Sequence, residues 1–274
     1  MVTHMFEDIS KIVLITDMDG TFLPASKIPS KKNLEAVKRF QDAGGKFSIA
    51  TGRAIQAASQ YFEDFNVNCP IIMCNGGMVY DVNTKKQIYD VYLPDNARNF
   101  TAKILKDNPD VGCEVLRLDN VYVPHMTAME KKHCNICKVN PIICSIDDIP
   151  DNWYKVLFTN IPDKLRNLIN YTLHYNFDNV DFVISAPQYY EMLPQNISKG
   201  TALKKMKEIC HMDDYTFVAV GDYNNDIEMI QCADVGICPS NAADDVKEAS
   251  DIVLDVSCEE DAIASVVEYI FSKI

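Results

Sequence analysis

The stretch VLITDMDGTF, residues 13–22, joins an apolar run to two carboxylates and a turn. The run VLIT has the composition of a strand buried in a parallel sheet. Asp17 and Asp19 follow it directly, before a Gly-Thr turn. Because residues i and i+2 of an extended chain point to the same face, both carboxylates leave the strand end together. Buried acid is costly unless it is compensated, so this strand end predicts a functional site.

The composition is that of an ordinary globular protein. The chain has 274 residues, which suggests about two domains, and it is 47% hydrophobic and 24% charged. The net charge of −13 argues against nucleic acid or an anionic membrane as the main partner. We therefore expect no nucleic acid and no membrane among its partners, and a monomer or weak homodimer.

Targeting signals and cysteine usage point to the cytoplasm. The first residues show no cationic segment followed by an apolar one, so no signal peptide is expected. No apolar run reaches the length of about 18 residues that a membrane span needs. The ten cysteines are scattered singly, which suits free thiols in a reducing compartment.

Both ends of the chain alternate strand and helix patterns. Near the N-terminus, strands are predicted at 11–16, 46–51 and 70–74, and helices at 30–45, with Ser30 as N-cap, and at 53–65. Near the C-terminus, strands are predicted at 216–221, 234–238 and 251–254, and helices at 198–210, 225–233, 241–250 and 259–274. This alternation predicts a parallel sheet with helices on its faces.

The middle of the chain has a different character. It holds strand patterns at 111–118, 121–123, 154–159 and 179–185 and helix patterns at 96–107 and 163–175. The predicted fold class is therefore α/β: a Rossmann-like parallel-sheet core, residues 1–83 and 190–274, with an inserted α+β cap domain, residues 84–189.

Polar side chains gather where the predicted core strands end, which is where open α/β sheets bind ligands. These residues are Asp17, Asp19, Thr51, Gly52, Arg53, Asp222, Asn225 and Asp226, with Lys199 opening the helix that follows the insert. Two carboxylates about 4 Å apart repel by roughly 4 kcal/mol even at an effective dielectric constant of about 20. A divalent cation would offset this repulsion, and oxygen ligands alone favour Mg²⁺.

The remaining polar groups suit a phosphoryl group. Lys199, the Thr51 hydroxyl and the Asn225 amide can all contact phosphoryl oxygens. A carboxylate beside a metal can act as a nucleophile, and a second one can protonate the leaving oxygen and then activate water. The pattern has room for both roles.

The motifs DMDGT, ATGR, Lys199 in SKGTAL and GDYNND, in that order, resemble the four motifs of the haloacid dehalogenase-like (HAD) phosphohydrolases. The large insert between the second and third motifs is similar to the type IIB cap of the Cof-like subfamily. NGG at 75–77 and YYEMLPQNISKGTAL at 189–203 are also typical of that subfamily. The resemblance covers essentially the whole chain.

The resemblance implies a role for each matching residue. Asp17 would be the nucleophile that forms a phospho-aspartate, and Asp19 the general acid and then base, whose backbone carbonyl also binds Mg²⁺. Asp222 would bind the metal, and Asp226 would do so through water or orient a partner. Thr51, Gly52, Arg53, Lys199 and Asn225 would contact the phosphoryl group or substrate, with Arg53 equally compatible with a surface ion pair.

The function expected from these motifs is Mg²⁺-dependent hydrolysis of a small phosphorylated metabolite, with sugar phosphates as the family's usual class. Three alternatives remain open: a phosphomutase of similar layout, a phospho-accepting signalling module without turnover, and a catalytically silent binder. In the cap, Arg117, His125 and Lys155 are candidates for reading the substrate. The segment HCNIC (133–137) with Cys144 lacks a second matching pair of metal ligands, so ordinary thiols are favoured there over zinc.

Overall fold

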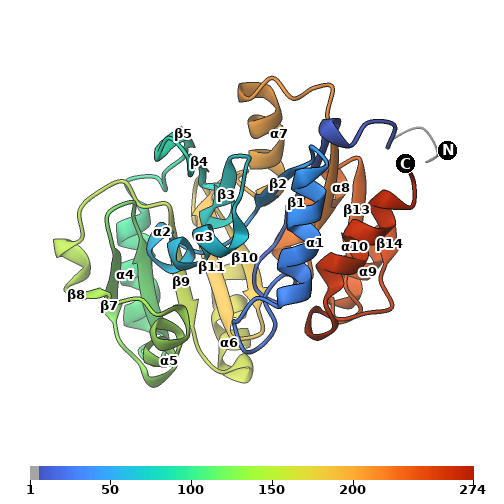
Figure 1. The fold of residues 1–274 in the computed structure, drawn as a ribbon. Coiled ribbons are helices and arrows are strands. Elements are labelled where there is room, and N and C mark those ends of the chain that lie inside the picture. The colour runs from blue at the N-terminus through green and yellow to red at the C-terminus, as the bar shows by residue number, and fades with distance from the viewer. Residues whose placement is uncertain (1–5) are drawn as a thin grey trace. The chain divides into compact units, whose positions relative to one another are not determined.

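The structure, a computed structural model, describes residues 6–274, which fall into two compact units (Figure 1). The core holds the chain up to Thr51, Tyr61–Tyr89 and Ser198–Ile274, and the cap holds Gly52–Gln60 and Asp90–Ile197. These limits differ by several residues from the expected boundaries at 83/84 and 189/190. The reason is that β5 (Lys86–Asp90) lies beside β4 (Met78–Asp81), whereas β11 (Tyr189–Pro194) pairs inside the cap sheet.

The core is built on a parallel sheet, as the α/β fold class predicts. Its strand order is β14 (Ile252–Val253), β13 (Val235–Cys238), β12 (Thr216–Val220), β1 (Ile12–Thr16) and β2 (Lys46–Ile49). All four pairings are parallel, and every residue of β1 is buried. A bridge from Ala50 to Ile72 brings β3 (Ile71–Met73) beside β2, and β3 pairs antiparallel with β4.

Helices cover both faces of this sheet. α1 (Lys31–Asp42) packs against α10 (Ala262–Phe271), and α7 (Lys199–Ile209) packs against α8 (Ile227–Cys232); a further short helix, α9 (Asp244–Ala249), contacts α8. Val13 and Ile15 of β1 share a hydrophobic cluster with residues of α7 and α8. Ser30 caps α1 as predicted, its hydroxyl accepting a hydrogen bond from the Asn33 amide at 3.0 Å.

One predicted core helix differs from the structure. Residues 53–65 form two single turns, α2 (Ile55–Ala58) and α3 (Phe62–Phe65), joined by a 3₁₀ turn at Ser59–Tyr61. The contacts of this segment are divided, because its first part clusters with the cap and its second part with the core.

The strand order has a switch point between β1 and β12. From β1 the chain moves to β2 on one side, whereas from β12 it moves to β13 and β14 on the other. The carboxyl ends of β1 and β12 are therefore adjacent, with no crossover helix over them, which is where doubly wound sheets bind ligands.

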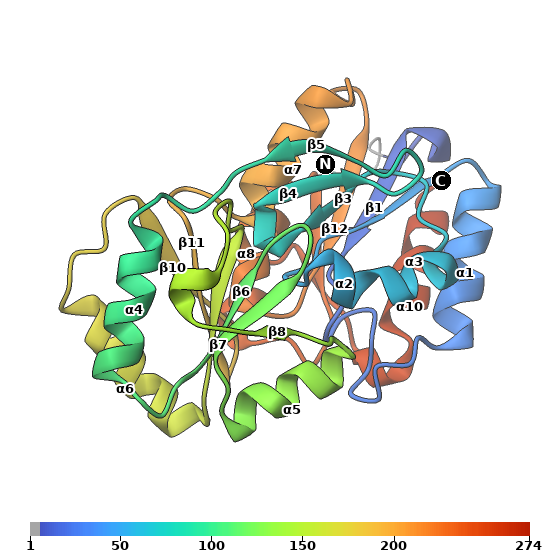
Figure 2. The same ribbon diagram turned by 90° about the vertical axis from the view of Figure 1, so that its left-hand side faces the viewer.

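The cap has its own sheet and its own hydrophobic core. The order is β10 (Val180–Ala186), β11, β9 (Lys155–Thr159), β6 (Gly112–Leu116), β7 (Val121–His125) and β8 (Ile142–Ile143), antiparallel except for β7–β8. The helices α4 (Ala97–Asp107) and α6 (Pro162–Leu173) bury one face, and α5 (Ala128–Cys137) packs on the other (Figure 2). This is the inserted α+β domain that the sequence predicts.

Two expectations from composition can be compared with the structure. All ten cysteines lie in the described range and are free thiols, as predicted. Within residues 6–274, no helix combines the length and apolar character needed to cross a bilayer.

Candidate active site

Three carboxylates meet at the switch point of the core sheet. Asp17 directly follows β1, Asp222 follows β12, and Asp226 ends a 3₁₀ turn (Asn224–Asp226) after the same strand. One oxygen from each carboxylate lies within 4.8 Å of the others, and Asp17 and Asp226 are buried. The parallel register forces this meeting, because the Asp17 amide donates to the carbonyl of Val220 at the end of β12, 2.8 Å away.

Lys199 bridges two of these carboxylates. Its side chain is fully buried, and Nζ lies 2.5 Å from Asp17 Oδ1 and 2.6 Å from Asp226 Oδ1. Lys199 is the first residue of α7, whose start is fixed by a capping box between Ser198 and Thr201. The helix start therefore aims the ammonium group at the strand ends.

Asp226 also holds the loop that carries Asp222. Its second oxygen, Oδ2, accepts hydrogen bonds from the backbone amides of Asp222 (3.0 Å) and Tyr223 (3.2 Å). One carboxylate oxygen of Asp226 thus contacts Lys199 and the other accepts the loop amides. Because both oxygens have partners, the carboxylate can be buried.

The DGT turn supplies two further supports for Asp222. The hydroxyl of Thr21 donates to Asp222 Oδ1 at 2.6 Å. Gly20 has φ +92°, and a Cβ at this position would collide with the Asp222 carboxylate. Only glycine combines this backbone conformation with such close approach. Thr21 was absent from the predicted site residues, although it stands in the motif that revealed them.

Asp19 is not one of the three clustered carboxylates, although its charge adds to the raised pKa of Asp17. Its side chain is about one-third exposed, and Oδ1 lies 2.8 Å from Nζ of Lys27. The backbone of Asp19 pairs with Leu23 across the turn, which redirects the chain after β1. The same-face argument from an extended strand therefore does not extend to Asp19, because the strand ends at Thr16.

Two amide side chains connect β3 to the switch point. Asn225 donates from Nδ2 to Asn75 Oδ1 at 3.0 Å, and Asn75 lies in the turn that follows β3. The other amide atom of Asn225, Oδ1, is buried and has no hydrogen-bond partner within residues 6–274. Asn75 belongs to the NGG motif at 75–77 but was not among the predicted site residues. Thr51 follows β2, is buried, and links β2 to β3 through its backbone, since its amide donates to Ile72.

Gly52 and Arg53 cluster with the cap rather than with the core. The guanidinium of Arg53 donates to the Ala57 carbonyl at 3.0 Å. A role for these two residues in phosphate binding stays a prediction.

The three cap residues suggested as substrate readers all have partners within the cap. Lys155 is buried and pairs with Glu191 at 2.7 Å, and the ring of His125 lies 2.6 Å from the Val111 carbonyl oxygen. Arg117 contacts Asp119 at 3.0 Å.

The charges of the core site are unbalanced. Burial raises the pKa of the Asp17 carboxyl to about 7, with the Lys199 charge opposing the rise and Asp226 adding to it. Burial, followed by Asp17 and Asp226, raises the pKa of Asp222 well above its usual value. For Lys199, burial acts to lower the pKa, but the two carboxylates raise it above its usual value. Lys199 is therefore a permanent cation among acids that resist ionisation together.

A divalent cation fits this group of oxygens. Three ionised carboxylates and one ammonium carry a net charge of about −2, which one doubly charged ion would neutralise. The clustered donors are carboxylate oxygens only, the set that Mg²⁺ prefers. Asp17, Asp222 and Asp226 are the residues that could hold it.

A strand-end aspartate, a buried lysine and an acidic loop thus lie together at the switch point of an α/β core. A sequence profile of the haloacid dehalogenase-like hydrolases matches residues 14–267. The chain belongs to this family. Within it, the protein is a phosphatase of the Cof-like type, as the following relatives indicate.

Curated relatives of similar length are phosphatases. The chain is 30% identical to the 5-amino-6-(5-phospho-D-ribitylamino)uracil phosphatase YwtE of Bacillus subtilis (strain 168), over 93% of this chain and 96% of that protein. It is 26% identical to YcsE of the same organism, a phosphatase of the same name, over 96% and 97%. A solved HAD subclass IIB sugar phosphatase has the same fold, with a TM-score of 0.82 at 21% identity over 96% of this chain and 99% of that one.

Proposed function

We propose that the protein is a Mg²⁺-dependent phosphomonoesterase that hydrolyses a small phosphorylated metabolite through a phospho-aspartate on Asp17. The observation that carries the proposal is the buried contact of 2.5 Å between Lys199 and Asp17, at the end of β1 and beside Asp222 and Asp226. A buried ion pair with a purely structural role would be complete with Lys199 and two acids. A phosphoryl-transfer site needs in addition an acidic group that binds a metal, and Asp222 supplies the third carboxylate.

In the first half-reaction, a carboxylate oxygen of Asp17 forms a bond to phosphorus as the bond from phosphorus to the ester oxygen breaks. Asp19 gives its proton to the departing oxygen. Lys199 stabilises the negative charge on the phosphoryl oxygens, and it also favours the ionised, nucleophilic form of Asp17. The Thr51 hydroxyl and the Asn225 amide orient the remaining oxygens.

In the second half-reaction, Asp19 takes a proton from water, and the water oxygen bonds to phosphorus as the bond to Asp17 breaks. Inorganic phosphate leaves and both aspartates return to their starting state. Mg²⁺ bound by Asp17, Asp222 and Asp226 would neutralise charge on the phosphoryl group. Thr21 and Gly20 maintain the position of the Asp222 carboxylate for that purpose.

The substrate class that we propose is the phosphate ester of a sugar or sugar alcohol. Two curated relatives are named for a substrate that carries a phosphorylated ribityl group, and the fold neighbour is named as a sugar phosphatase. A polyol phosphate is the chemistry common to these names.

The test is phosphate release from p-nitrophenyl phosphate with Mg²⁺ or with EDTA, for the wild type and Asp17→Asn. Turnover that requires Mg²⁺ and is lost in Asp17→Asn supports the proposal. Asp42→Asn, an exposed aspartate at the end of α1, is the matched control and should keep full activity. Folded wild-type protein that gives no turnover with Mg²⁺ would refute it, and one stoichiometric burst without turnover would instead indicate a phospho-accepting module.

A panel of sugar and sugar-alcohol phosphates then tests the substrate class. The proposal expects at least one of them to exceed p-nitrophenyl phosphate in kcat/KM. Uniformly poor hydrolysis of the panel, with p-nitrophenyl phosphate turned over, would reject the polyol class but leave the phosphatase proposal standing.

A further inference from the structure

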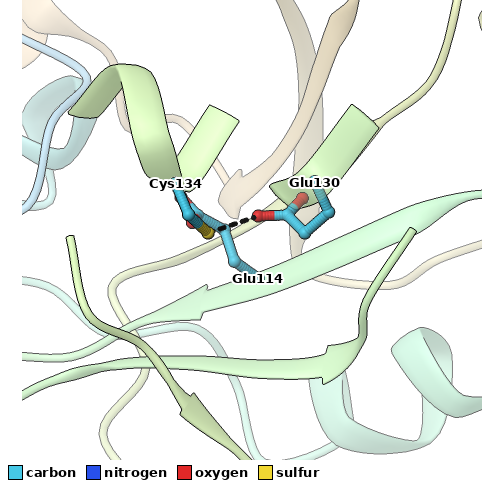
Figure 3. Close-up of side chains that lie close together, drawn as sticks. All are labelled: Glu114, Glu130 and Cys134. Atoms are coloured by element: carbon cyan, nitrogen blue, oxygen red, sulfur yellow. Dashed lines mark hydrogen bonds between the residues drawn. The ribbon is translucent and has the colours of Figure 1, made fainter. Parts of the chain in front are cut away.

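The cap holds a group of buried polar side chains that is complete as it stands. Glu114 on β6 lies beside Glu130 and Cys134 on α5 (Figure 3). The Cys134 thiol donates to Glu130 Oε1 at 3.4 Å, and Thr159 donates to Oε2 of the same carboxylate at 2.9 Å. The His133 ring nitrogen Nε2 lies 3.3 Å from Glu114 Oε1. Each carboxylate therefore has a partner of its own, and the group requires no ligand.

The core, in contrast, holds a buried acceptor without a donor. Asn225 Oδ1 is buried and has no hydrogen-bond partner in the described chain, residues 6–274. An unpaired buried acceptor costs free energy, so this amide keeps its place because a neighbour holds it. Within the same residues, the one hydrogen bond of the Asn225 side chain runs from Nδ2 to Asn75 Oδ1, at 3.0 Å. The position of the Asn225 amide therefore depends on Asn75.

Asn75 lies in a strained turn. Cys74, Asn75 and Gly76 follow β3 directly, and all three have positive φ, at +52°, +55° and +105°. Glycine adopts this left-handed backbone freely and asparagine tolerates it, whereas cysteine rarely does. Cys74 and Asn75 are each 1% exposed. A strained and buried turn persists only where its surroundings fix it, and such turns are concentrated at functional sites.

The elements that fix this turn are those of the proposed phosphoryl site. The backbone amide of Asn75 donates to the Thr51 carbonyl at 3.1 Å, which ties the turn to the residue that follows β2. Gly76 lies against the start of α7, where a Cβ would collide with the carbonyl of Ser198, one residue before Lys199. One turn thus connects the strand end of Thr51 with the helix start of Lys199, and all of these residues belong to the core.

The contact with Asn75 leaves one donor of Asn225 free. The amide group of Asn225 carries two N–H bonds, and Asn75 Oδ1 accepts from one of them. The second makes no hydrogen bond within the part of the chain that the structure describes. Asn225 directly precedes Asp226, whose carboxylate contacts Lys199 at 2.6 Å. A donor that is held in place next to this cation suits a phosphoryl oxygen, because it need not reorganise when charge develops there.

We propose that Asn75 is a positioning residue of the phosphoryl site, which holds the Asn225 amide so that one N–H remains for a phosphoryl oxygen. The inference rests on the proposed function, because that function assigns Asn225 to the phosphoryl group. It goes further by tracing the position of Asn225 to a turn 150 positions away in the sequence. Asn75 acts through Asn225 and not on the substrate, so its loss has an effect only while Asn225 is present.

The test is a double-mutant cycle on the full-length protein with Mg²⁺, in which calorimetry measures the affinity for inorganic phosphate. Asn75→Gly removes the acceptor but keeps the turn, since glycine adopts the left-handed backbone freely. We expect Asn75→Gly and Asn225→Ala each to weaken phosphate binding about tenfold, as when a hydrogen bond to a charged group is lost. The double variant should also be weakened about tenfold, because both changes remove the same bond. A combined loss of about a hundredfold, unchanged affinity in Asn75→Gly, or a wild type that does not bind phosphate would overturn the inference.

Two further variants make the assignment specific. Asn66→Gly is the matched control and should keep full phosphate affinity, because Asn66 also has a positive φ, +46°, but is exposed at the end of α3. Asn75→Asp keeps an acceptor for the Asn225 amide, so in that background Asn225→Ala should again weaken binding about tenfold. An effect of Asn225→Ala that is as small there as in the Asn75→Gly background would contradict the inference.

Phosphate release from p-nitrophenyl phosphate separates this inference from the proposed function. Wild-type turnover together with full phosphate affinity in Asn75→Gly would refute the positioning role alone. Wild-type protein that binds phosphate and shows the expected cycle, but gives no turnover, would refute the proposed function and support the role of Asn75.

Discussion

Replacing Lys199 by methionine should destabilise the core strongly. Methionine fills a similar volume but leaves Asp17 and Asp226 buried without the ammonium that lies 2.5 Å and 2.6 Å from them. Removing one partner of a buried ion pair typically costs about 3–5 kcal/mol, and here one cation serves two carboxylates. We therefore expect Lys199→Met to lower the free energy of unfolding by about 3–5 kcal/mol in the presence of EDTA.

The loss should depend on pH. The pKa of Asp17 in the folded wild type is already raised to about 7, and removing Lys199 takes away the influence that lowers it. The folded variant then binds protons that the unfolded chain, with a usual Asp pKa of 3.8, has released. Stability of the variant must fall as pH rises through this window, so the difference from wild type should be larger at about pH 8 than at about pH 6.

Urea denaturation followed by circular dichroism measures both effects. Lys207→Met on the same helix is the matched control, because Lys207 is partly exposed and lies 3.3 Å from Asp234. Such a surface pair contributes about 0–1 kcal/mol. Mg²⁺ should also stabilise Lys199→Met more than wild type, since the ion then faces one more uncompensated negative charge. A Lys199→Met midpoint equal to that of Lys207→Met would refute the reasoning.

Three further predictions concern buried carboxylates and the residues beside them. Thr21→Val should weaken Mg²⁺ affinity about tenfold, because Asp222 loses its 2.6 Å hydrogen bond, and Thr21→Ser should restore that affinity. Affinity is measured from the Mg²⁺ dependence of turnover, and an unchanged dependence in Thr21→Val would contradict the prediction. Gly20→Ala should lower the free energy of unfolding by about 1–3 kcal/mol and remove most of the turnover. Gly44 also has a positive φ but lies next to Ser10, so Gly44→Ala should lose stability alone. Equal kcat values for the two variants would argue that Gly20 does not position Asp222. Burial, followed by the charge of Glu114, raises the pKa of Glu130 to about 8 from its usual 4.5, so the folded state retains a proton that the unfolded state has lost between these values. With EDTA present, this contribution to stability should decline as pH rises from 4.5 to about 8. The unfolding temperature of Glu130→Gln should therefore fall less steeply with pH than that of the wild type. Parallel curves for the two proteins would contradict the raised pKa of Glu130.

The core could be predicted well because its signals are local. An apolar run such as 12–16 identifies a buried parallel strand wherever it stands, and the polar residues that follow it must lie at the sheet edge. Asp17, Asp222 and Asp226 were identified in this way, and Lys199 as the residue that opens the helix after the insert; the structure brings all four together.

Contacts between distant segments were harder to predict. The hydrogen bond from Thr21 to Asp222 joins residues 201 positions apart, and the one from Asn225 to Asn75 joins residues 150 positions apart. Neither a threonine nor an asparagine indicates in the sequence which residue it will contact. Asp19 differs for a local reason, because β1 ends at Thr16 and the chain turns before Asp19, whose backbone pairs with Leu23.

The helix α5 was missed because its buried face is polar. Its sequence AMEKKHCNIC lacks the apolar spacing that predicts an amphipathic helix, and the residues that it buries are Glu130, Cys134 and Cys137.

The most direct measurement of the central claim is to trap the phosphoryl group on the protein. Wild type, Asp17→Asn and Asp19→Asn would be mixed with substrate and Mg²⁺, quenched in acid and reduced with borohydride, which converts an aspartyl phosphate to homoserine. The account predicts homoserine at position 17 by peptide mass spectrometry, more of it in Asp19→Asn because hydrolysis is slowed, and none in Asp17→Asn. Turnover with the phosphoryl group on another residue, or turnover that persists in Asp17→Asn, would contradict it.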